Sequence, residues 1–186
     1  MLDKLLSPDF EGDDIMNERL SFSIRPGELS DIPVALQFRD ALFQETGVPP
    51  SIYVEAKDQI ILDFYQAKTN AEQMRHFFAY NTEGQPVAVA GALIKNDFPF
   101  FLYKPGYFGW IIDVYTLPAF RRKGLAGRLF ENTLKWLQSK GVREVRLLSF
   151  EAEARRIYER YGFAATHEMS LGFDRGDTID RIIGNR

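Results

Sequence analysis

Three adjacent cations and a set of small side chains meet where a helix is expected to begin. Arg121, Arg122 and Lys123 precede the segment Gly124–Gly127, in which two glycines and an alanine accompany one leucine. Glycine costs a helix about 1 kcal/mol relative to alanine, so small residues in a first turn need a reason beyond helix propensity. The first N–H groups of a helix have no partner within it, and the positive end of the helix dipole adds to their attraction for anions. We therefore expect a binding turn for a di- or polyphosphate.

The same residues also fit a tight connection between a strand and a helix whose charges are simply solvated. The dinucleotide fingerprint Gly-x-Gly-x-x-Gly is absent, and so is the phosphate-binding loop Gly-x4-Gly-Lys-Ser/Thr. The position of the turn, directly between an apolar strand and an amphipathic helix, favours the anion site.

Two other residues could take part in chemistry. Asp113 is a carboxylate within the apolar strand sequence WIIDVY, and Tyr158 shares one helical face with Ala154, Ile157 and Tyr161. Asp113 is a candidate general base, although it also fits a structural Asp that is hydrogen-bonded or faces solvent. Periodicity alone makes Tyr158 a core aromatic. The residues by themselves leave both interpretations open.

The elements that must position these residues follow from the apolar pattern and its breakers. The expected order is strand, two helices, three strands, helix, strand, helix and strand, which predicts a mixed α/β sheet covered by helices. The strands are expected over 20–26, 74–81, 86–94, 109–116, 142–150 and 166–173, and the helices over about 31–47, 52–68, 124–139 and 151–163.

The length of 186 residues predicts one domain. We place it over residues 20–173. A loose, polar arm is expected over 1–19, and a polar tail over 174–186.

The composition argues against several classes of function. The formal net charge is −3, whereas general nucleic-acid and anionic-membrane binders present basic faces. The chain has no cysteine, so disulfides, thiolate metal sites and thiol nucleophiles are excluded, and its two histidines argue against a multi-histidine metal site. No segment has the roughly 18 apolar residues of a membrane span, and the acidic start lacks the order of a secretory signal. We expect a cytoplasmic protein that uses no metal and binds neither nucleic acid nor membrane.

The segment VYTLPAFRRKGLAGRLF resembles the acyl-CoA motif of the GNAT superfamily of N-acyltransferases. A strand end is followed by Pro118 in the connection and then by the pattern Arg121-x-x-Gly124-x-Ala126. The resemblance implies the acyl-CoA N-acyltransferase fold, an α/β fold with a mixed, mostly antiparallel central sheet flanked by helices.

A second motif of the family, Ala-x-x-x-Tyr-x-x-x-Gly-Phe, matches Ala154, Tyr158, Gly162 and Phe163 at the same spacing. Gly162 also stands where a left-handed helix cap is expected. The resemblance covers about residues 22–173 and is specific within 109–163.

The resemblance implies an N-acetyltransferase in which an amine attacks the thioester of acetyl-CoA directly. Tyr158 would contact the coenzyme and protonate the leaving thiolate, and Asp113 would be the candidate base. Val114, Tyr115 and Thr116 would hold the pantetheine arm. The pyrophosphate would be held by Arg121, Arg122, Lys123, Gly124, Leu125, Ala126 and Gly127.

Two positions depart from the family pattern. Many relatives have Asn or Ser seven residues before the tyrosine, in contact with the coenzyme, and here that position is Glu151. We keep Glu151 among the coenzyme-binding candidates, although a carboxylate is a poorer neighbour for phosphates. N-terminal protein acetyltransferases often have a carboxylate twelve residues before the tyrosine, where this chain has Arg146, so that substrate class is in doubt.

The acceptor is expected to be an amine of a small molecule or a peptide. In relatives its site forms from segments that correspond to about Thr46–Tyr53 and Asn96–Phe108. The second segment contains six aromatic residues, which could line an apolar acceptor pocket, form a homodimer face or belong to the ordinary core.

Two other functions compete with catalysis. Intact motifs without a competent base would make a coenzyme-A-binding regulatory module. Contacts of Arg121, Arg122, Lys123 and Arg128 with RNA or DNA are the third hypothesis, against which the negative net charge argues.

Overall fold

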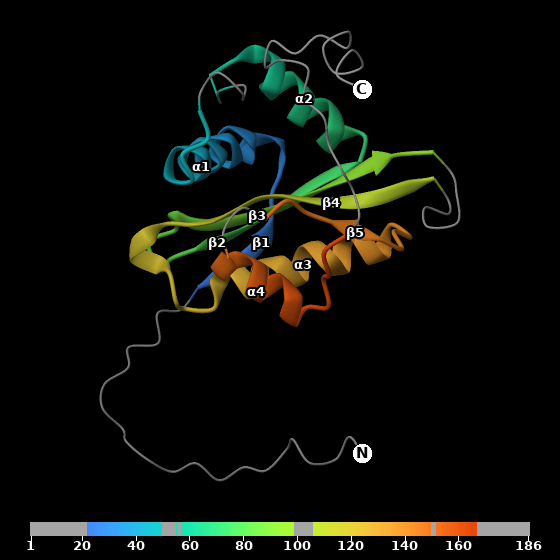
Figure 1. Ribbon diagram of the computed structural model, residues 1–186. Coiled ribbons are helices and arrows are strands. Elements are labelled where there is room, and N and C mark those ends of the chain that lie inside the picture. Colours follow the sequence, from blue (N-terminus) through green and yellow to red (C-terminus); the bar gives the residue numbers. More distant parts are fainter. Residues whose placement is uncertain (1–21, 50–54, 56, 99–105, 150–151, 167–186) are drawn as a thin grey trace, which may run out of the picture. The chain divides into compact units, whose positions relative to one another are not determined.

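The computed structural model describes residues 22–49, 55, 57–98, 106–149 and 152–166, and the chain divides into two compact units (Figure 1). The first unit, Met1–Leu148, contains the sheet and helices α1 to α3, and the second, Ser149–Arg186, contains α4 (Ala152–Arg160). The arm expected over 1–19 and the tail expected over 174–186 lie outside the described residues. So does the strand expected over 166–173, apart from its first residue.

A five-stranded sheet forms the centre of the first unit, with its strands in the spatial order β1-β2-β3-β4-β5. Neighbouring strands are antiparallel from β1 to β4, and β5 runs parallel to β4. This confirms the expected mixed, mostly antiparallel sheet. The strands are β1 (Ser23–Pro26), β2 (Met74–Tyr80), β3 (Pro86–Asn96), β4 (Tyr107–Thr116) and β5 (Val145–Arg146).

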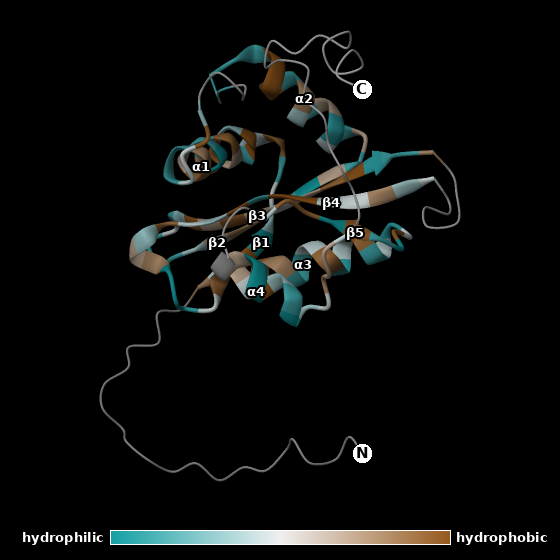
Figure 2. Ribbon diagram, in the orientation of Figure 1, coloured by the Kyte–Doolittle hydropathy of each residue, from teal (hydrophilic) through white to brown (hydrophobic). Residues whose placement is uncertain are grey.

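Helices cover both faces of this sheet. In Figure 1, α1 (Ile32–Glu45) and α2 (Gln59–Asn70) lie on one face and α3 (Leu125–Ser139) lies on the other. A one-turn 3-10 helix, η1 (Leu29–Asp31), leads into α1. Hydrophobic residues run along the central strands, whereas α3 carries hydrophobic and hydrophilic residues on different sides (Figure 2).

The central strands β2, β3 and β4 are largely buried because each face of the sheet has its own apolar cluster. Under α3, the cluster contains Phe77, Ala79, Val87, Ala90, Leu125 and Leu129. Under α1, it contains Ala35, Phe38, Phe78, Val89 and Tyr115. Burying one such large side chain contributes about 1.5–3 kcal/mol, so the helices hold β3 and β4 firmly in place.

Two elements are shorter than the sequence predicts. Strand β5 contains only Val145 and Arg146, because its parallel ladder with β4 ends at Trp110, and Leu148 beyond it is exposed. An apolar pattern does not reveal where a partner strand stops. Helix α2 begins at Gln59 instead of near residue 52, since Asp58 has an extended backbone with ψ of 129°.

Candidate functional site

Strand β4 is irregular at the carboxylate that the sequence singled out. The register with β3 shifts between Val89 and Gly91, so Asp113 and Val114 together face the single residue Ala90. Asp113 has a φ of 54°, a left-handed conformation that Asp tolerates better than most residues. This β-bulge inserts one extra residue and changes the direction of the side chain.

The Asp113 carboxylate meets two buried partners. Its Oδ2 accepts a hydrogen bond of 2.6 Å from the Tyr65 hydroxyl and lies 2.9 Å from His76 Nε2. All three side chains are buried. Burial, and next the charge of Asp113, raise the pKa of Tyr65 well above its usual value, so Tyr65 keeps its proton and donates. The carboxylate is therefore held by a phenol that stays protonated and by the buried imidazole of His76.

The His76 ring fits because its neighbour across the ladder is a glycine. His76 lies opposite Gly91, and a Cβ on Gly91 would come within 2.5 Å of the ring atoms Cδ2 and Nε2. The ring also stacks on Tyr65, with centroids 5.4 Å apart and planes 18° from parallel. Sequence reasoning missed Tyr65 and His76. The signal that could have found His76 is a histidine in an apolar hairpin strand whose partner strand carries a glycine.

The end of β4 has the residues that were expected to hold the pantetheine arm. Val114 packs against the cluster under α3, and Tyr115 belongs to the cluster under α1. Thr116 Oγ1 is buried and has no hydrogen-bond partner within the described residues. The Thr116 carbonyl accepts a hydrogen bond of 2.9 Å from Arg121 Nε, which joins the strand end to the turn that follows.

Arg121 is also joined to the end of α1. Its Nη2 donates to Glu45 Oε2 at 2.6 Å, and the same oxygen accepts a 3.0 Å hydrogen bond from the Tyr115 hydroxyl. The Arg121 guanidinium lowers the pKa of Glu45. The two charged side chains are 40% and 45% exposed, and exposed ion pairs are worth little, about 0–1 kcal/mol. Water and dissolved ions can therefore compete with Glu45 for Arg121.

The connection from β4 to α3 contains two residues in the left-handed backbone conformation. A 3-10 turn, η3 (Pro118–Phe120), precedes Arg122 with φ of 63° and Gly124 with φ of 74°. A Cβ on Gly124 would meet nothing within 4 Å, so glycine serves the backbone conformation here, not the space around it. Leu125, the first residue of α3, is buried, so only its backbone is available to a ligand. Ala126 and Gly127 follow it, half-buried, in the first turn of α3.

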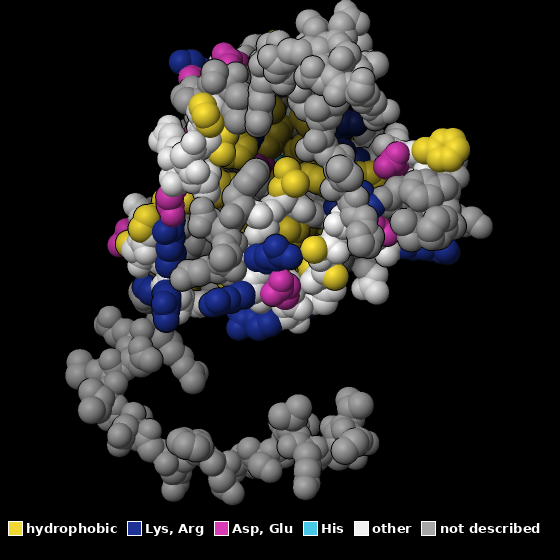
Figure 3. All heavy atoms as spheres, viewed as in Figure 1, with side chains coloured by type: hydrophobic (Ala, Val, Ile, Leu, Met, Phe, Trp, Pro, Cys, Tyr) yellow, Lys and Arg dark blue, Asp and Glu magenta, His cyan; other side chains and the backbone are white. Residues whose placement is uncertain are grey.

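The three cations of the turn are exposed but have different neighbours. Lys123 Nζ lies 5.3 Å from the centroid of the Phe120 ring and 5.9 Å from that of Phe22. Arg121 bonds the strand end and α1, as described above. Figure 3 shows Lys and Arg side chains (dark blue) grouped over the β4–α3 connection, at the left of the view. The structure thus brings the predicted pyrophosphate-binding residues together in one turn.

Tyr158 belongs to the second unit, where it lies in α4. Its backbone carbonyl accepts the N–H groups of Tyr161 and Phe163, and Gly162 has a φ of 90°, the left-handed cap that the sequence predicts. The Tyr158 ring lies 6.1 Å from the ring of Phe163, and burial raises the pKa of its hydroxyl. Glu151 lies outside the described residues.

The expected acceptor segments are described only in part. Phe108 is buried in the core and Phe98 is 72% exposed, whereas residues 50–53 and 99–105 lie outside the described residues. Arg146, which replaces a carboxylate of some relatives, bonds Glu144 at 3.0 Å.

Within the described ranges, no group of three or more His, Asp or Glu residues could hold a metal ion. No helix in the described part of the chain is long and apolar enough to cross a membrane.

Comparison with known proteins gives a family for this chain. Residues 39–163, more than half of the sequence, match the model of the Acetyltransferase (GNAT) family. No curated protein sequence matches.

Many solved structures share the fold. A predicted acetyltransferase from Clostridium acetobutylicum, solved with acetyl-CoA, has a TM-score of 0.74 at 22% identity over 82% of this chain and 96% of its own. Glucosamine-6-phosphate N-acetyltransferase from Arabidopsis thaliana has a TM-score of 0.60 at 25% identity over 83% and 99%. An aminoglycoside N-acetyltransferase in complex with CoA has a TM-score of 0.64 at 20% identity over 87% and 99%.

Proposed function

Because the chain belongs to the GNAT acetyltransferase family, we propose that it transfers the acetyl group of acetyl-CoA directly to an amine. The observation that carries this proposal is the segment from Val114 to Gly127. A strand end whose buried hydroxyl has no partner among the described residues is followed, after the short turn η3, by three exposed cations and the start of a helix.

The strand end suits an extended ligand. Leu117 donates its N–H to the Val87 carbonyl of β3, and alternate residues of an antiparallel strand direct their backbone groups to opposite edges. Thr116 therefore directs its N–H and carbonyl away from β3. We assign the pantetheine arm to this edge, along Val114, Tyr115 and Thr116, with Arg121 leaving the Thr116 carbonyl when the arm pairs with it.

The turn suits the pyrophosphate. The N–H groups at the start of α3, from Leu125 to Gly127, would donate to its oxygens, and the exposed charges of Arg121, Arg122 and Lys123 would add to the helix dipole. The Arg121–Glu45 pair is exposed and such pairs contribute only about 0–1 kcal/mol, so a pyrophosphate, which carries more than one negative charge, would compete with Glu45 for Arg121.

The reaction needs an acid and a base. The amine nitrogen attacks the thioester carbonyl carbon, the C–S bond breaks, and the leaving thiolate takes a proton from the Tyr158 hydroxyl. The nitrogen must lose one proton, and Asp113 is the candidate acceptor for it. No covalent intermediate with the protein is needed.

The double hydrogen bond on Asp113 supports one alternative. A carboxylate that already accepts from Tyr65 and pairs with His76 could be purely structural, in which case the protein would bind acyl-CoA as a regulatory module without turnover.

A primary amine of a small molecule or a peptide is the acceptor that we propose. Two of the structural neighbours are a glucosamine-6-phosphate and an aminoglycoside N-acetyltransferase, which supports a small-molecule amine. We further propose that the protein acts in the cytoplasm and needs no metal.

Two measurements test the proposal. Calorimetric titration with acetyl-CoA should show binding, and no binding at millimolar ligand would overturn it. A panel of amines, polyamines, amino acids and peptides should release free thiol from acetyl-CoA, whereas binding without release from any acceptor would support the regulatory module.

Tyr158→Phe tests the acid. We expect kcat to fall at least about 100-fold, because a general acid contributes that much, while acetyl-CoA still binds. Full turnover of this variant at saturating substrate would remove Tyr158 from the mechanism.

A further inference from the structure

The outer edge of the sheet is only partly covered where β2 begins. Strand β1 ends at Pro26, and the Gly27 N–H then adds one bond of 2.8 Å to the His76 carbonyl. Strand β2 starts earlier than this contact, at Met74, and its first two residues pair with β3 alone among the described strands. A space therefore remains beside Met74 and Arg75, on the side of β2 where β1 has already ended.

A cavity of about 240 Å³ occupies this space. Its walls are the connection from β1 to η1, the end of α2, the turn that leads into β2, the first two residues of β2, and Trp136 of α3. Pockets that bind drug-sized molecules measure about 300–1,000 Å³, so this cavity suits a smaller molecule.

The cavity is separate from the proposed acetyl-CoA site. The order of the strands puts β1 and β2 on the opposite side of the sheet from the edge of β4 that faces β5. Its described lining residues include none of the segment Val114–Gly127. Along the axis of α3, Trp136 lies about 16 Å from Leu125, at about 1.5 Å per residue. A ligand in this cavity would therefore leave the proposed coenzyme site free.

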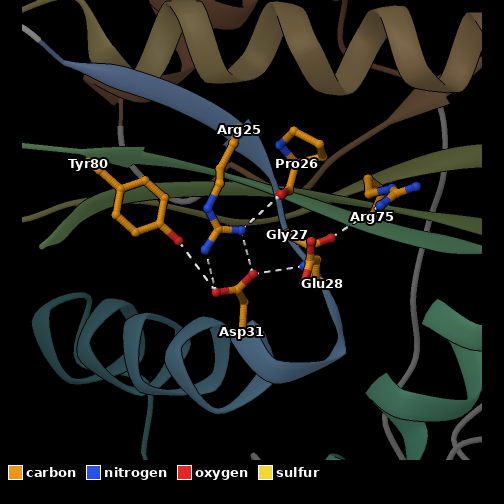
Figure 4. A network of polar contacts seen from close by, with 7 residues as sticks. All are labelled: Arg25, Pro26, Gly27, Glu28, Asp31, Arg75 and Tyr80. Carbon is orange, nitrogen blue, oxygen red and sulfur yellow. Dashed lines mark hydrogen bonds and ion pairs between the residues drawn. The ribbon is translucent and has the colours of Figure 1, made fainter. Parts of the chain in front are cut away.

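Hydrogen bonds fix the wall that the β1–η1 connection forms (Figure 4). The Asp31 carboxylate accepts bonds of 2.7 and 2.9 Å from the Arg25 guanidinium and one of 2.8 Å from the Glu28 N–H. From the side of β2, Arg75 Nη1 donates to the Gly27 carbonyl at 3.2 Å. A site whose walls are already held loses little conformational freedom when a ligand binds.

Two charged groups of opposite sign are available in the cavity. Arg75 is half-buried, and its bond to Gly27 uses one of the several N–H groups of the guanidinium. Glu28 is exposed, and its carboxylate accepts the N–H of Asp31, which leaves acceptor capacity for a ligand. Because Gly27 directly precedes Glu28, the two charges border the same part of the cavity.

The other walls add apolar surface without a further unpaired charge. Trp136 is half-buried and Leu29 is exposed, so both side chains can be covered by a ligand. Among the described lining residues the only other charged group is Glu72, which forms an ion pair with Lys140.

We propose that this cavity binds a free α-amino acid with an apolar side chain. The ligand carboxylate accepts hydrogen bonds from Arg75, and the ligand ammonium group pairs with Glu28. The ligand side chain lies against Leu29 and Trp136. A simple anion or cation would leave one of the two protein charges dehydrated and without a partner, whereas an α-amino acid carries both partners on one carbon. The inference goes beyond the proposed acetyl transfer and does not depend on it.

Three related probes test the need for both charges. L-leucine carries both, isocaproate is leucine without the amino group, and isoamylamine is leucine without the carboxylate. In calorimetric titrations we expect L-leucine to bind at least about tenfold more tightly than either analogue, because each analogue loses hydrogen bonds to a charged group. No binding of L-leucine at millimolar concentration, or equal binding of one analogue, would overturn the proposal.

Arg75→Gln tests the position of the site, and Arg143→Gln is the matched control. Arg143 is exposed and lies outside the cavity, so its replacement removes the same charge elsewhere. We expect Arg75→Gln to weaken L-leucine binding about tenfold or more and Arg143→Gln to stay within about twofold of the wild type. Both variants should bind acetyl-CoA as the wild type does. Unchanged affinity for L-leucine in Arg75→Gln would overturn the proposal.

A measurement on the unmodified protein covers the case in which Arg75→Gln fails to fold. The chain has two tryptophans, and Trp110 of β4 does not line the cavity. L-leucine should shift the indole N–H signal of Trp136 in NMR spectra and leave that of Trp110 in place. A titration that leaves the Trp136 signal unchanged would contradict the proposed site.

The same experiments separate this site from the acetyl-transfer site. L-leucine that releases thiol from acetyl-CoA and keeps its affinity in Arg75→Gln would be an acceptor bound at the transfer site, which would overturn the second site. A protein that releases no thiol with any amine, but whose Trp136 signal shifts with L-leucine, would overturn the acetyl transfer and support the amino-acid site.

Discussion

Two carboxylates in the first unit have almost the same partners and opposite surroundings. Asp113 Oδ2 meets the hydroxyl of Tyr65 and the ring of His76, and Glu45 Oε2 meets the hydroxyl of Tyr115 and the guanidinium of Arg121. The side chains of Asp113 and His76 are each 5% exposed, whereas those of Arg121 and Glu45 are 40% and 45% exposed.

This difference in burial separates two roles. A buried polar group that loses its partner has no water to replace it, so the cluster at Asp113 is fixed once the sheet and α2 have packed. Water and ions compete at the Glu45–Arg121 pair, so that contact can be exchanged for a ligand at little cost. The same kind of pairing therefore holds the proposed base in the first case and leaves the proposed coenzyme-binding cation, Arg121, exchangeable in the second.

The comparison predicts its largest effect for removal of the buried carboxylate. Asp113→Ala should lower the free energy of unfolding by about 3 kcal/mol, because Tyr65 loses its buried acceptor and alanine is strained at a φ of 54°. Denaturant titration measures this. Glu45→Ala is the matched control, and we expect it to cost less than about 0.5 kcal/mol.

Asp113→Asn separates strain from hydrogen bonding, since asparagine tolerates the left-handed conformation and still accepts from Tyr65. It should unfold at a denaturant concentration closer to the wild type than Asp113→Ala does. Equal costs for Asp113→Ala and Glu45→Ala would contradict the role that we give to burial.

The free energy of unfolding lost on replacing Asp31 should lie between the losses for Asp113 and Glu45, because the Asp31 side chain is 14% exposed and bonds Arg25. We expect Asp31→Asn to cost about 1 kcal/mol at neutral pH. The Arg25 guanidinium holds the pKa of Asp31 below its usual value of 3.8, so this contribution is present above that pH and is lost as the pH falls through the lower, folded-state pKa. The stabilities from urea titrations of both proteins should therefore begin to converge as the pH falls below about 3.8 and should coincide below the lower, folded-state pKa. A cost that persists in strong acid would exclude the ion pair as its source.

The smallest effect is expected at the exposed pair. Glu45→Gln removes the charge that competes for Arg121, so acetyl-CoA should bind about two- to fivefold more tightly at low salt, and the gain should shrink as salt screens the charges. Calorimetry at two ionic strengths measures both. Weaker binding in this variant would mean that Glu45 positions Arg121 for the coenzyme and does not compete with it.

The elements with long apolar patterns were predictable from the sequence. Helix α3 has a continuous apolar stripe from Leu125 to Leu137, and the two hairpin strands flank a turn in which Asn81 accepts the N–H groups of Glu83 and Gln85. The extent of β5 was not predictable, since the end of a ladder depends on the partner strand. Neither was the beginning of α2, which follows from the extended backbone of one residue, Asp58.

The candidate site divides in the same way. Residues Arg121 to Gly127 are consecutive in the chain, so the sequence alone shows that three cations precede the small residues of a helix start. Tyr65, His76 and Asp113 come from three elements, and no local pattern joins them. The pattern of apolar and polar residues along β4 also does not reveal the bulge that sets the direction of the Asp113 side chain.

The sequence by itself determined the family and the position of the glycine-rich turn between β4 and α3, because these depend on spacing along one stretch of chain. Tertiary structure alone decided the surroundings of each charge. Packing of α2 and β2 against a bulged strand buries Asp113 with Tyr65 and His76, while the approach of α1 to the turn leaves Glu45 and Arg121 in water. Burial depends on what the rest of the chain places around a residue, and it is burial that makes one carboxylate a fixed group and the other an exchangeable one.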